Sequence, residues 1–288
     1  MAELWEAYDS QLDCTRAIKI MRPEVAKHAQ TVEQFFQQAR SQARLQHPNI
    51  LQVQRVGRYG PNGIPFFVSE WVDGESLEQR LQREGALPPA AAWDILCQII
   101  SGLAYAHEQG MIHRDLHPGN ILLENPIRDS GDRRIRVRIK DFGLAAILDA
   151  PFREHAIVPG SKPEYTAPEI VAGMEVDHRA DIYSLGIVLY HMLAGFPPFQ
   201  GSKRGEILFK QVHDPLPAVS PQVREALGPE GMAILTRMTQ KRPDLRYSRY
   251  DELLEAAKAS PVMLDRRKTD SVAVQRSSQA PQAPARAA

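Results

Sequence analysis

The stretch HRDLHPGNILL at residues 113–123 and the stretch IRVRIKDFG at residues 135–143 decide the fold of this chain. The apolar run after Asn120 and the strict alternation before Asp141 predict two strands joined as a hairpin. Antiparallel pairing places Asn120 and Asp141 at the same end of the hairpin, so that a carbonyl oxygen and a carboxylate lie side by side. Oxygen ligands of this kind suit Mg²⁺, which binds one or two protein groups together with substrate phosphates. Asp115, in the loop before Asn120, is placed to take a proton from an attacking hydroxyl.

The composition indicates a globular protein whose function depends on a local site. Hydrophobic residues make up 43% of the 288 residues and charged residues 24%, which excludes a disordered or fibrous chain. Lys and Arg number 35 and are balanced by 35 Asp and Glu, so bulk charge does not favour nucleic acid or an anionic membrane as a partner. Two cysteines, Cys14 and Cys97, are too few for a disulfide scaffold. With no signal peptide and no membrane segment in the sequence pattern, we expect a cytoplasmic protein.

The pattern along the chain predicts an α+β fold with two lobes. A small β-rich lobe is expected over residues 1–72 and a larger helical lobe over residues 73–259. From residue 260 to residue 288 Ala, Pro, Gln, Ser and Arg dominate, which predicts a disordered tail. In the small lobe the expected strands are residues 5–8, 16–21 and 66–72, with a helix over residues 32–45. In the large lobe the expected helices are residues 88–110, 181–193, 229–238 and 249–258.

These motifs, in this order, resemble the protein kinase family, and in particular its bacterial serine/threonine type. The resemblance extends over residues 1–258 and rests on the catalytic loop at 113–120 and the triplet Asp-Phe-Gly at 141–143. It also rests on the Ala-Pro-Glu triplet that ends at Glu169. Arg246 is placed like the arginine that pairs with this glutamate.

The resemblance implies a bilobal enzyme that transfers the γ-phosphoryl group of ATP to serine or threonine in protein substrates. It implies that Asp115 is the base and that Asn120 and Asp141 hold Mg²⁺. It also implies that His117 stands where serine/threonine kinases carry a lysine that stabilises the transferring phosphoryl group. The residues expected to contact ATP directly or through the phosphate-binding lysine are Lys19, Leu4, Ala17, Gln38, Glu70, Val72 and Leu122. The oligomeric state is left open.

Three departures from the family pattern bear on activity. Residues 1–4 align with the end of the Gly-rich loop, whose first strand and first two glycines are missing. Either a start codon assigned too late or a real loss explains this. Gln38 stands where a glutamate normally pairs with Lys19, so the lysine is expected to be held less firmly. Partial protonation of His117 near neutral pH would supply only part of the lysine's charge. Lower activity is expected, and a pseudokinase that binds nucleotide as a scaffold is the alternative.

Overall fold

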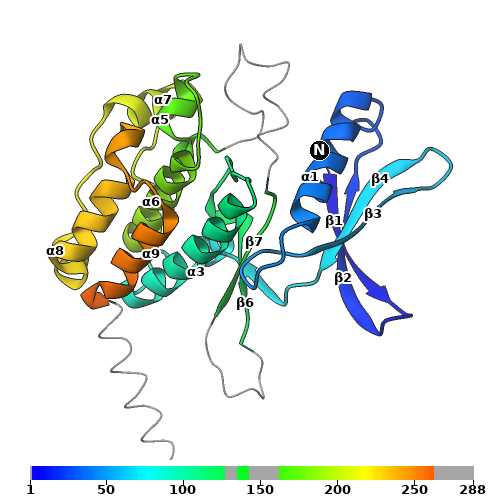
Figure 1. Cartoon of the computed structure of the whole chain (residues 1–288), viewed down its shortest axis with the longest axis horizontal. Helices are drawn as coiled ribbons and strands as arrows, with labels where there is room; N and C mark the ends of the chain where they lie inside the picture. The colour runs from blue at the N-terminus through cyan, green and yellow to red at the C-terminus, as the bar shows by residue number, and fades with distance from the viewer. Residues whose placement is uncertain (1, 127–134, 143–161, 263–288) are drawn as a thin grey trace, which may run out of the picture.

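Four antiparallel strands near the N-terminus form the sheet of the smaller lobe, on the right of Figure 1. The computed structural model describes residues 2–126, 135–142 and 162–262. The sheet has the order β1-β2-β4-β3. Its strands are β1 (Ala2–Asp9), β2 (Cys14–Met21), β3 (Val53–Tyr59) and β4 (Ile64–Glu70).

One helix, α1 (Ala29–Ala43), packs on this sheet and buries one face. Val32, Phe35, Phe36 and Ala39 recur at helical spacing and form the small core of this lobe. The ring of Phe35 lies 5.2 Å from that of Phe67 on β4. The side of α1 that faces the sheet is therefore fixed by packing.

A second sheet, of order β5-β6-β7, lies between the small sheet and the helices (Figure 1). Its strands are β5 (Gly74–Ser76), β6 (Ile121–Glu124) and β7 (Arg136–Ile139). Ile121 of β6 pairs with Ile139 of β7, so the predicted hairpin is confirmed. Backbone bonds from Leu51 and to Asn49 hold Ile139 to the segment after α1, at 2.8 Å each. The hairpin is thus tied to both lobes.

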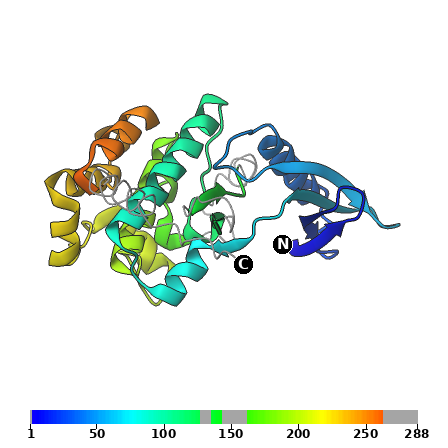
Figure 2. The same cartoon turned by 90° about the horizontal axis from the view of Figure 1, so that it is seen from below.

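The larger lobe is helical, as Figure 2 shows from a second direction. Its central helix, α6, is apolar on nearly every side and is buried by neighbours that include α3 and α8. Trp93 of α3 donates from Nε1 to the carbonyl of Ala257 at 2.8 Å, which joins α3 to α9. The helices are α2 (Leu77–Glu84), α3 (Pro89–Glu108), α5 (Pro168–Val171), α6 (Arg179–Ala194), α7 (Arg204–His213), α8 (Pro221–Met238) and α9 (Tyr250–Ala259). Short 3₁₀ turns are η1 (Pro118–Asn120), η2 (Pro163–Tyr165) and η3 (Pro243–Leu245).

The predicted division into a β-rich part and a helical part is confirmed, while several element boundaries differ. Strand β3, helix α2 and helix α7 were not predicted. Gly228, with a φ of +64°, is not helical and divides α8 into two segments. The second segment begins at Pro229, as predicted, whereas the first, from Pro221, was not predicted. Ser260 and Val262, at the start of the predicted tail, are buried against the helices, and residues 263–288 lie outside the described residues. Among the described helices, none is both long and apolar enough to cross a membrane.

Candidate active site

A buried carboxylate on α6, that of Asp181, holds the loop before β6 in place. Asp181 accepts hydrogen bonds from the backbone N–H groups of His113 and Arg114, both at 2.7 Å. Arg114 has a φ of +64°, in the left-handed region that non-glycine residues rarely adopt. The two bonds from Asp181 stabilise this strained backbone. The residue that follows, Asp115, is therefore presented in one orientation.

His113 locks this loop to the end of β7. Its Nε2 donates to the carbonyl of Lys140 at 3.0 Å, and its Nδ1 accepts from the backbone N–H of Asp115 at 3.3 Å. Its ring lies 4.7 Å from the ring of Phe142. Burial lowers the pKa of His113 to about 4, so the ring is neutral and packs as part of the core.

Asp115 lies in the loop before β6, with its carboxyl largely buried. Burial, with repulsion from Asp141, raises its pKa to about 6. A carboxyl with this pKa is ionised at neutral pH and is still basic enough to accept a proton. Asn120 donates from Nδ2 to the carbonyl of Asp115 at 2.9 Å, which leaves the amide oxygen of Asn120 as an acceptor.

Asp141 is paired with Lys19, which reaches it from strand β2. Lys19 Nζ lies 2.7 Å from Asp141 Oδ1, and Lys140 Nζ lies 3.5 Å from Asp141 Oδ2. Burial opposes ionisation of Asp141, but these two ammonium groups outweigh it and hold the pKa of the carboxyl well below its usual range. Asp141 also has a φ of +65°, so its backbone is strained where the chain leaves β7.

Gln38 lies beside this ion pair rather than within it. The side chain is buried on α1, and its Nε2 is 3.5 Å from Asp141 Oδ1. The amide thus neighbours the partner of Lys19. Glu33, the carboxylate that α1 does carry, is on the outer face and pairs with Arg40 at 3.4 Å.

His117 is neutral, and the expectation that it carries a partial positive charge is wrong. Its Nδ1 accepts the backbone N–H of Gly119 at 3.0 Å, and its Nε2 lies 3.8 Å from Asp115 Oδ2. Burial, reinforced by the nearby ammonium of Lys162, lowers the pKa of His117 to about 3. The side chain therefore shapes the loop but brings no charge to it at neutral pH.

A cavity of about 590 Å³ lies between the two lobes, with Lys19 and Asp141 in its wall. Leu4, Ala17 and Leu122 give it apolar sides, and Leu4 is paired with Lys19 in the sheet register. Glu70, the last residue of β4, and Trp71 and Val72, which follow it, also line the cavity. This shape suits a flat apolar ring with a charged group directed toward Lys19.

The cavity's metal-binding capacity rests on Asn120 and Asp141. Pairing of Ile121 with Ile139 brings the two residues to the same end of the hairpin, as the sequence predicts. Within the described residues there is no cluster of three or more His, Cys, Asp or Glu side chains placed to bind a metal. One carboxylate and one amide oxygen fit Mg²⁺, which takes its other ligands from water and phosphate.

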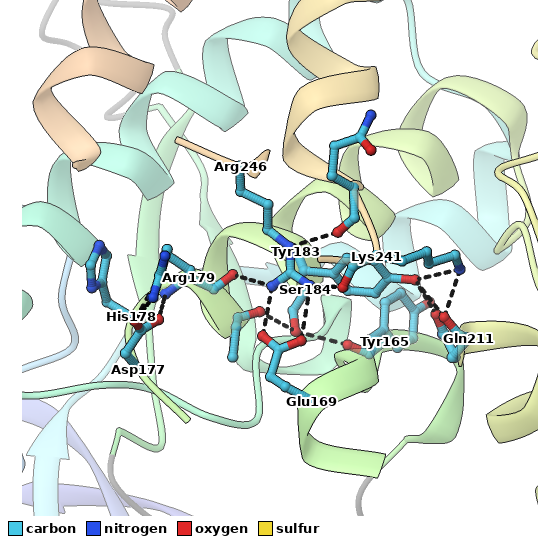
Figure 3. A network of polar contacts seen from close by, with 12 residues as sticks. Tyr165, Glu169, Asp177, His178, Arg179, Tyr183, Ser184, Gln211, Lys241 and Arg246 are labelled. Atoms are coloured by element: carbon cyan, nitrogen blue, oxygen red, sulfur yellow. Dashed lines mark hydrogen bonds and ion pairs between the residues drawn. The ribbon is translucent and has the colours of Figure 1, made fainter. Parts of the chain in front are cut away.

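A buried ion pair joins Glu169 of α5 to Arg246, in the segment between α8 and α9. Arg246 places Nη1 2.6 Å from Glu169 Oε1 and Nη2 2.8 Å from Glu169 Oε2 (Figure 3). The same guanidinium donates to the carbonyls of Arg179, Gln240 and Lys241. The predicted partnership of Arg246 with Glu169 is present.

The family profile described as "Protein kinase domain" matches residues 1–261. The chain belongs to the protein kinase family. A probable serine/threonine-protein kinase of Bifidobacterium longum, pknA2, is 34% identical over 85% of this chain and 31% of its own length. The serine/threonine-protein kinase PknA of Mycobacterium tuberculosis is 35% identical over 86% of this chain and 55% of its own length. The kinase domain thus spans between about a third and just over half of these curated relatives.

A solved structure gives the same fold. The crystal structure of the kinase domain of Mycobacterium tuberculosis PknI matches with a TM-score of 0.63 and 27% identity, over 90% of each chain. The bilobal kinase fold that the motifs predict is therefore confirmed.

Four polar residues around the kinase cavity were not singled out from the sequence. Lys140 pairs with Asp141, and Gln42 of α1 donates to the carbonyl of Leu51 at 2.9 Å. Glu78 of α2 lines the cavity and is paired with Lys162. Lys140 was detectable as the neighbour of Asp141, and the contact of Gln42 spans nine residues, whereas the pair of Glu78 and Lys162 joins residues 84 positions apart.

Proposed function

We propose that this kinase domain transfers the γ-phosphoryl group of ATP to serine or threonine hydroxyls in proteins. The observation that carries the proposal is that Lys19 and Asp141 pair in the wall of one cavity of nucleotide size, which Gly119 also lines. Asn120, the next residue after Gly119, donates a hydrogen bond to the carbonyl of Asp115. The names of its relatives, serine/threonine-protein kinases, support the choice of hydroxyl substrate.

Each residue around the cavity has a distinct part in the proposed reaction. Leu4, Ala17 and Leu122 line the part of the cavity that takes the adenine ring of ATP, and the backbone of Glu70 and Val72 borders the polar edge of that ring. Lys19 binds the α- and β-phosphates once it exchanges its pairing with Asp141 for them. When bound, Mg²⁺ neutralises the phosphate charge, and Asn120 with Asp141 holds it.

The transfer step exchanges one phosphorus–oxygen bond for another. The substrate oxygen bonds to the γ-phosphorus as the bond to the bridging β–γ oxygen breaks, which releases ADP. The proton of the attacking hydroxyl passes to Asp115, whose raised pKa suits it to this task. The products are ADP and a phosphoprotein, and the proton is then lost to solvent.

The second candidate is a nucleotide-binding scaffold with little transfer. The amide of Gln38 and the neutral ring of His117 favour it, because both positions lack the charge that the family pattern has. ATP binding is common to the two functions. Phosphate transfer is what separates them.

The test compares wild type with Asp115→Asn and Asp141→Asn in nucleotide binding and in phosphate transfer with Mg²⁺. Asp115→Asn should bind Mg-ATP normally and lose transfer by about a hundredfold or more, because only the base is gone. Asp141→Asn should weaken the dependence of ATP binding on Mg²⁺. Wild-type transfer in Asp115→Asn would contradict the mechanism, and binding without any transfer by wild type would favour the scaffold.

We place this activity in the cytoplasm, where ATP and Mg²⁺ are available. Cys14 and Cys97 are free cysteines, in keeping with a reducing compartment. Proteins are the expected partners, with no role for nucleic acid or a membrane in the proposed reaction.

A further inference from the structure

In the loop that carries Asp115, the side chain that faces the base is that of His117, while the charge of Arg114 acts on Asp181. His117 lies 3.8 Å from Asp115, but its Nδ1 accepts the backbone N–H of Gly119 and therefore carries no proton, so the ring is neutral. The phosphoryl group has to pass next to Asp115, because the base must reach the proton of the attacking hydroxyl. A cation fixed near that point stabilises the negative charge in transit. Since His117 is neutral, this cation has to come from another part of the chain.

Lys162 is the cation that the fold brings to this place. Its ammonium is paired with Glu78, which lines the cavity together with Gly119 of the catalytic loop. Lys19 and Lys140 are both engaged with Asp141, on the metal-binding side.

The backbone of Lys162 is well anchored. Its carbonyl accepts the N–H of Tyr165 at 3.1 Å and the hydroxyl of Thr166 at 3.2 Å. The carbonyl of Tyr165 in turn accepts the hydroxyl of Ser184 on α6 at 2.8 Å. The base of the lysine side chain is thus held by the frame of the large lobe.

The side chain of Lys162 is ion-paired with Glu78, in the first turn of α2. Ser76 caps this helix together with Gln79, which fixes where Glu78 emerges. Glu78 also overlies the catalytic loop, since a Cβ on Gly119 would lie 3.0 Å from its Oε2. Both members of the pair are about one-third exposed, and Glu78 lines the cavity.

We propose that Lys162 supplies the positive charge that stabilises the transferring phosphoryl group beside Asp115, in place of the charge that His117 lacks. Glu78 holds the ammonium at this edge of the cavity when no nucleotide is bound. The inference rests on the proposed kinase function and adds a residue to it. An ammonium on a flexible stem can leave Glu78 for a phosphate without any movement of the backbone.

The experiment measures kcat and the KM for ATP in wild type, Lys162→Met, Glu78→Gln and the double variant Lys162→Met/His117→Lys. Lys210→Met is the matched control, because Lys210 is equally exposed and is ion-paired with Glu206 on α7. Thermal melting of each variant checks folding. Lys162→Met should lower kcat by about a hundredfold with little change in KM, since the charge acts on the transferring group. The added His117→Lys should recover most of the lost kcat, because it returns a cation to the loop.

A merely structural role for Lys162 gives a different pattern. In that case Glu78→Gln, which breaks the same ion pair, would lose as much kcat as Lys162→Met, and His117→Lys would rescue nothing. Either result overturns the inference. We expect Lys210→Met to keep kcat within about twofold of wild type, and Glu78→Gln to lose much less kcat than Lys162→Met. Absence of transfer by wild type would overturn the proposed function and this inference together, whereas transfer undiminished in Lys162→Met overturns the inference alone.

Discussion

Removal of Arg246 should destabilise the large lobe more than removal of its partner Glu169. The two side chains are 0% and 3% exposed and make two bonds of 2.6 and 2.8 Å. Arg246→Met leaves the carboxylate buried with no counter-charge, which costs about 3–5 kcal/mol. Glu169→Gln costs less, about 2–3 kcal/mol, because three backbone carbonyls still surround the guanidinium.

The double variant isolates the pairing itself. With both charges gone, the remaining loss of stability comes from three backbone carbonyls that no longer accept a hydrogen bond. Each costs about 1 kcal/mol, or roughly 3 kcal/mol in all. The two single losses therefore sum to about 2 kcal/mol or more above the double variant, which is the coupling energy of the pair.

Urea denaturation followed by Trp fluorescence measures these values, and Trp93, buried in the large lobe, serves as the probe. Lys258→Met, on the exposed side of α9, is a control that should stay within about 0.5 kcal/mol of wild type. If Arg246→Met lost less than about 1 kcal/mol, or if the single losses simply added up, the pair would not stabilise the lobe as reasoned from the structure.

The remaining predictions concern the cavity. Gln38→Glu should raise kcat about tenfold, equivalent to roughly 1.4 kcal/mol of barrier. The new carboxylate on α1 would pair with Lys19, which would free the carboxylate of Asp141 to bind the metal. An unchanged steady-state rate would mean that Gln38 does not control the position of Lys19. Ser69 is small and buried, its hydroxyl 3.3 Å from the Glu70 carbonyl, and it borders the cavity. ATP-competitive inhibitors with a bulky group should therefore inhibit wild type and lose potency in Ser69→Met, with the KM for ATP nearly unchanged; equal inhibition of both forms would refute this role. The pH profile of kcat/KM should fall about tenfold per unit below pH 6, because Asp115, with a pKa of about 6, must be ionised to accept a proton. A profile that stays flat down to pH 5 would rule out Asp115 as the base.

The sequence predicts the elements whose pattern is regular. Strands β6 and β7 follow from an apolar run and a strict alternation, and the loop before them carries a distinctive order of residues. Strand β3 was missed because its sequence, VQRVGRY, alternates poorly and contains Gly57. That glycine is explained only by packing, since a Cβ there would lie 2.9 Å from the ring of Phe66. Helix α2 is short and polar, and its one signal was the capping pair Ser76 and Gln79.

The residues of the candidate site also fall into two groups, those that a local motif predicts and those that only the folded chain reveals. Lys19, Asn120 and Asp141 were found because a local motif names each of them. The charge on His117 was misjudged, since its low pKa comes from burial and from Lys162, neither of which a local pattern contains. The pairing of Lys162 with Glu78 joins residues 84 positions apart, so it became visible only in the folded chain.

The most direct test of the kinase assignment is phosphate transfer by the purified chain. The chain is incubated with Mg²⁺, ATP labelled at the γ-phosphate and a general protein substrate, with Asp115→Asn as the matched negative control. The labelled protein is then hydrolysed to identify the phosphorylated amino acid. We predict label on phosphoserine or phosphothreonine that requires Mg²⁺ and is lost in Asp115→Asn. Label that persists in Asp115→Asn, or ATP binding without labelled protein in wild type, would contradict the assignment.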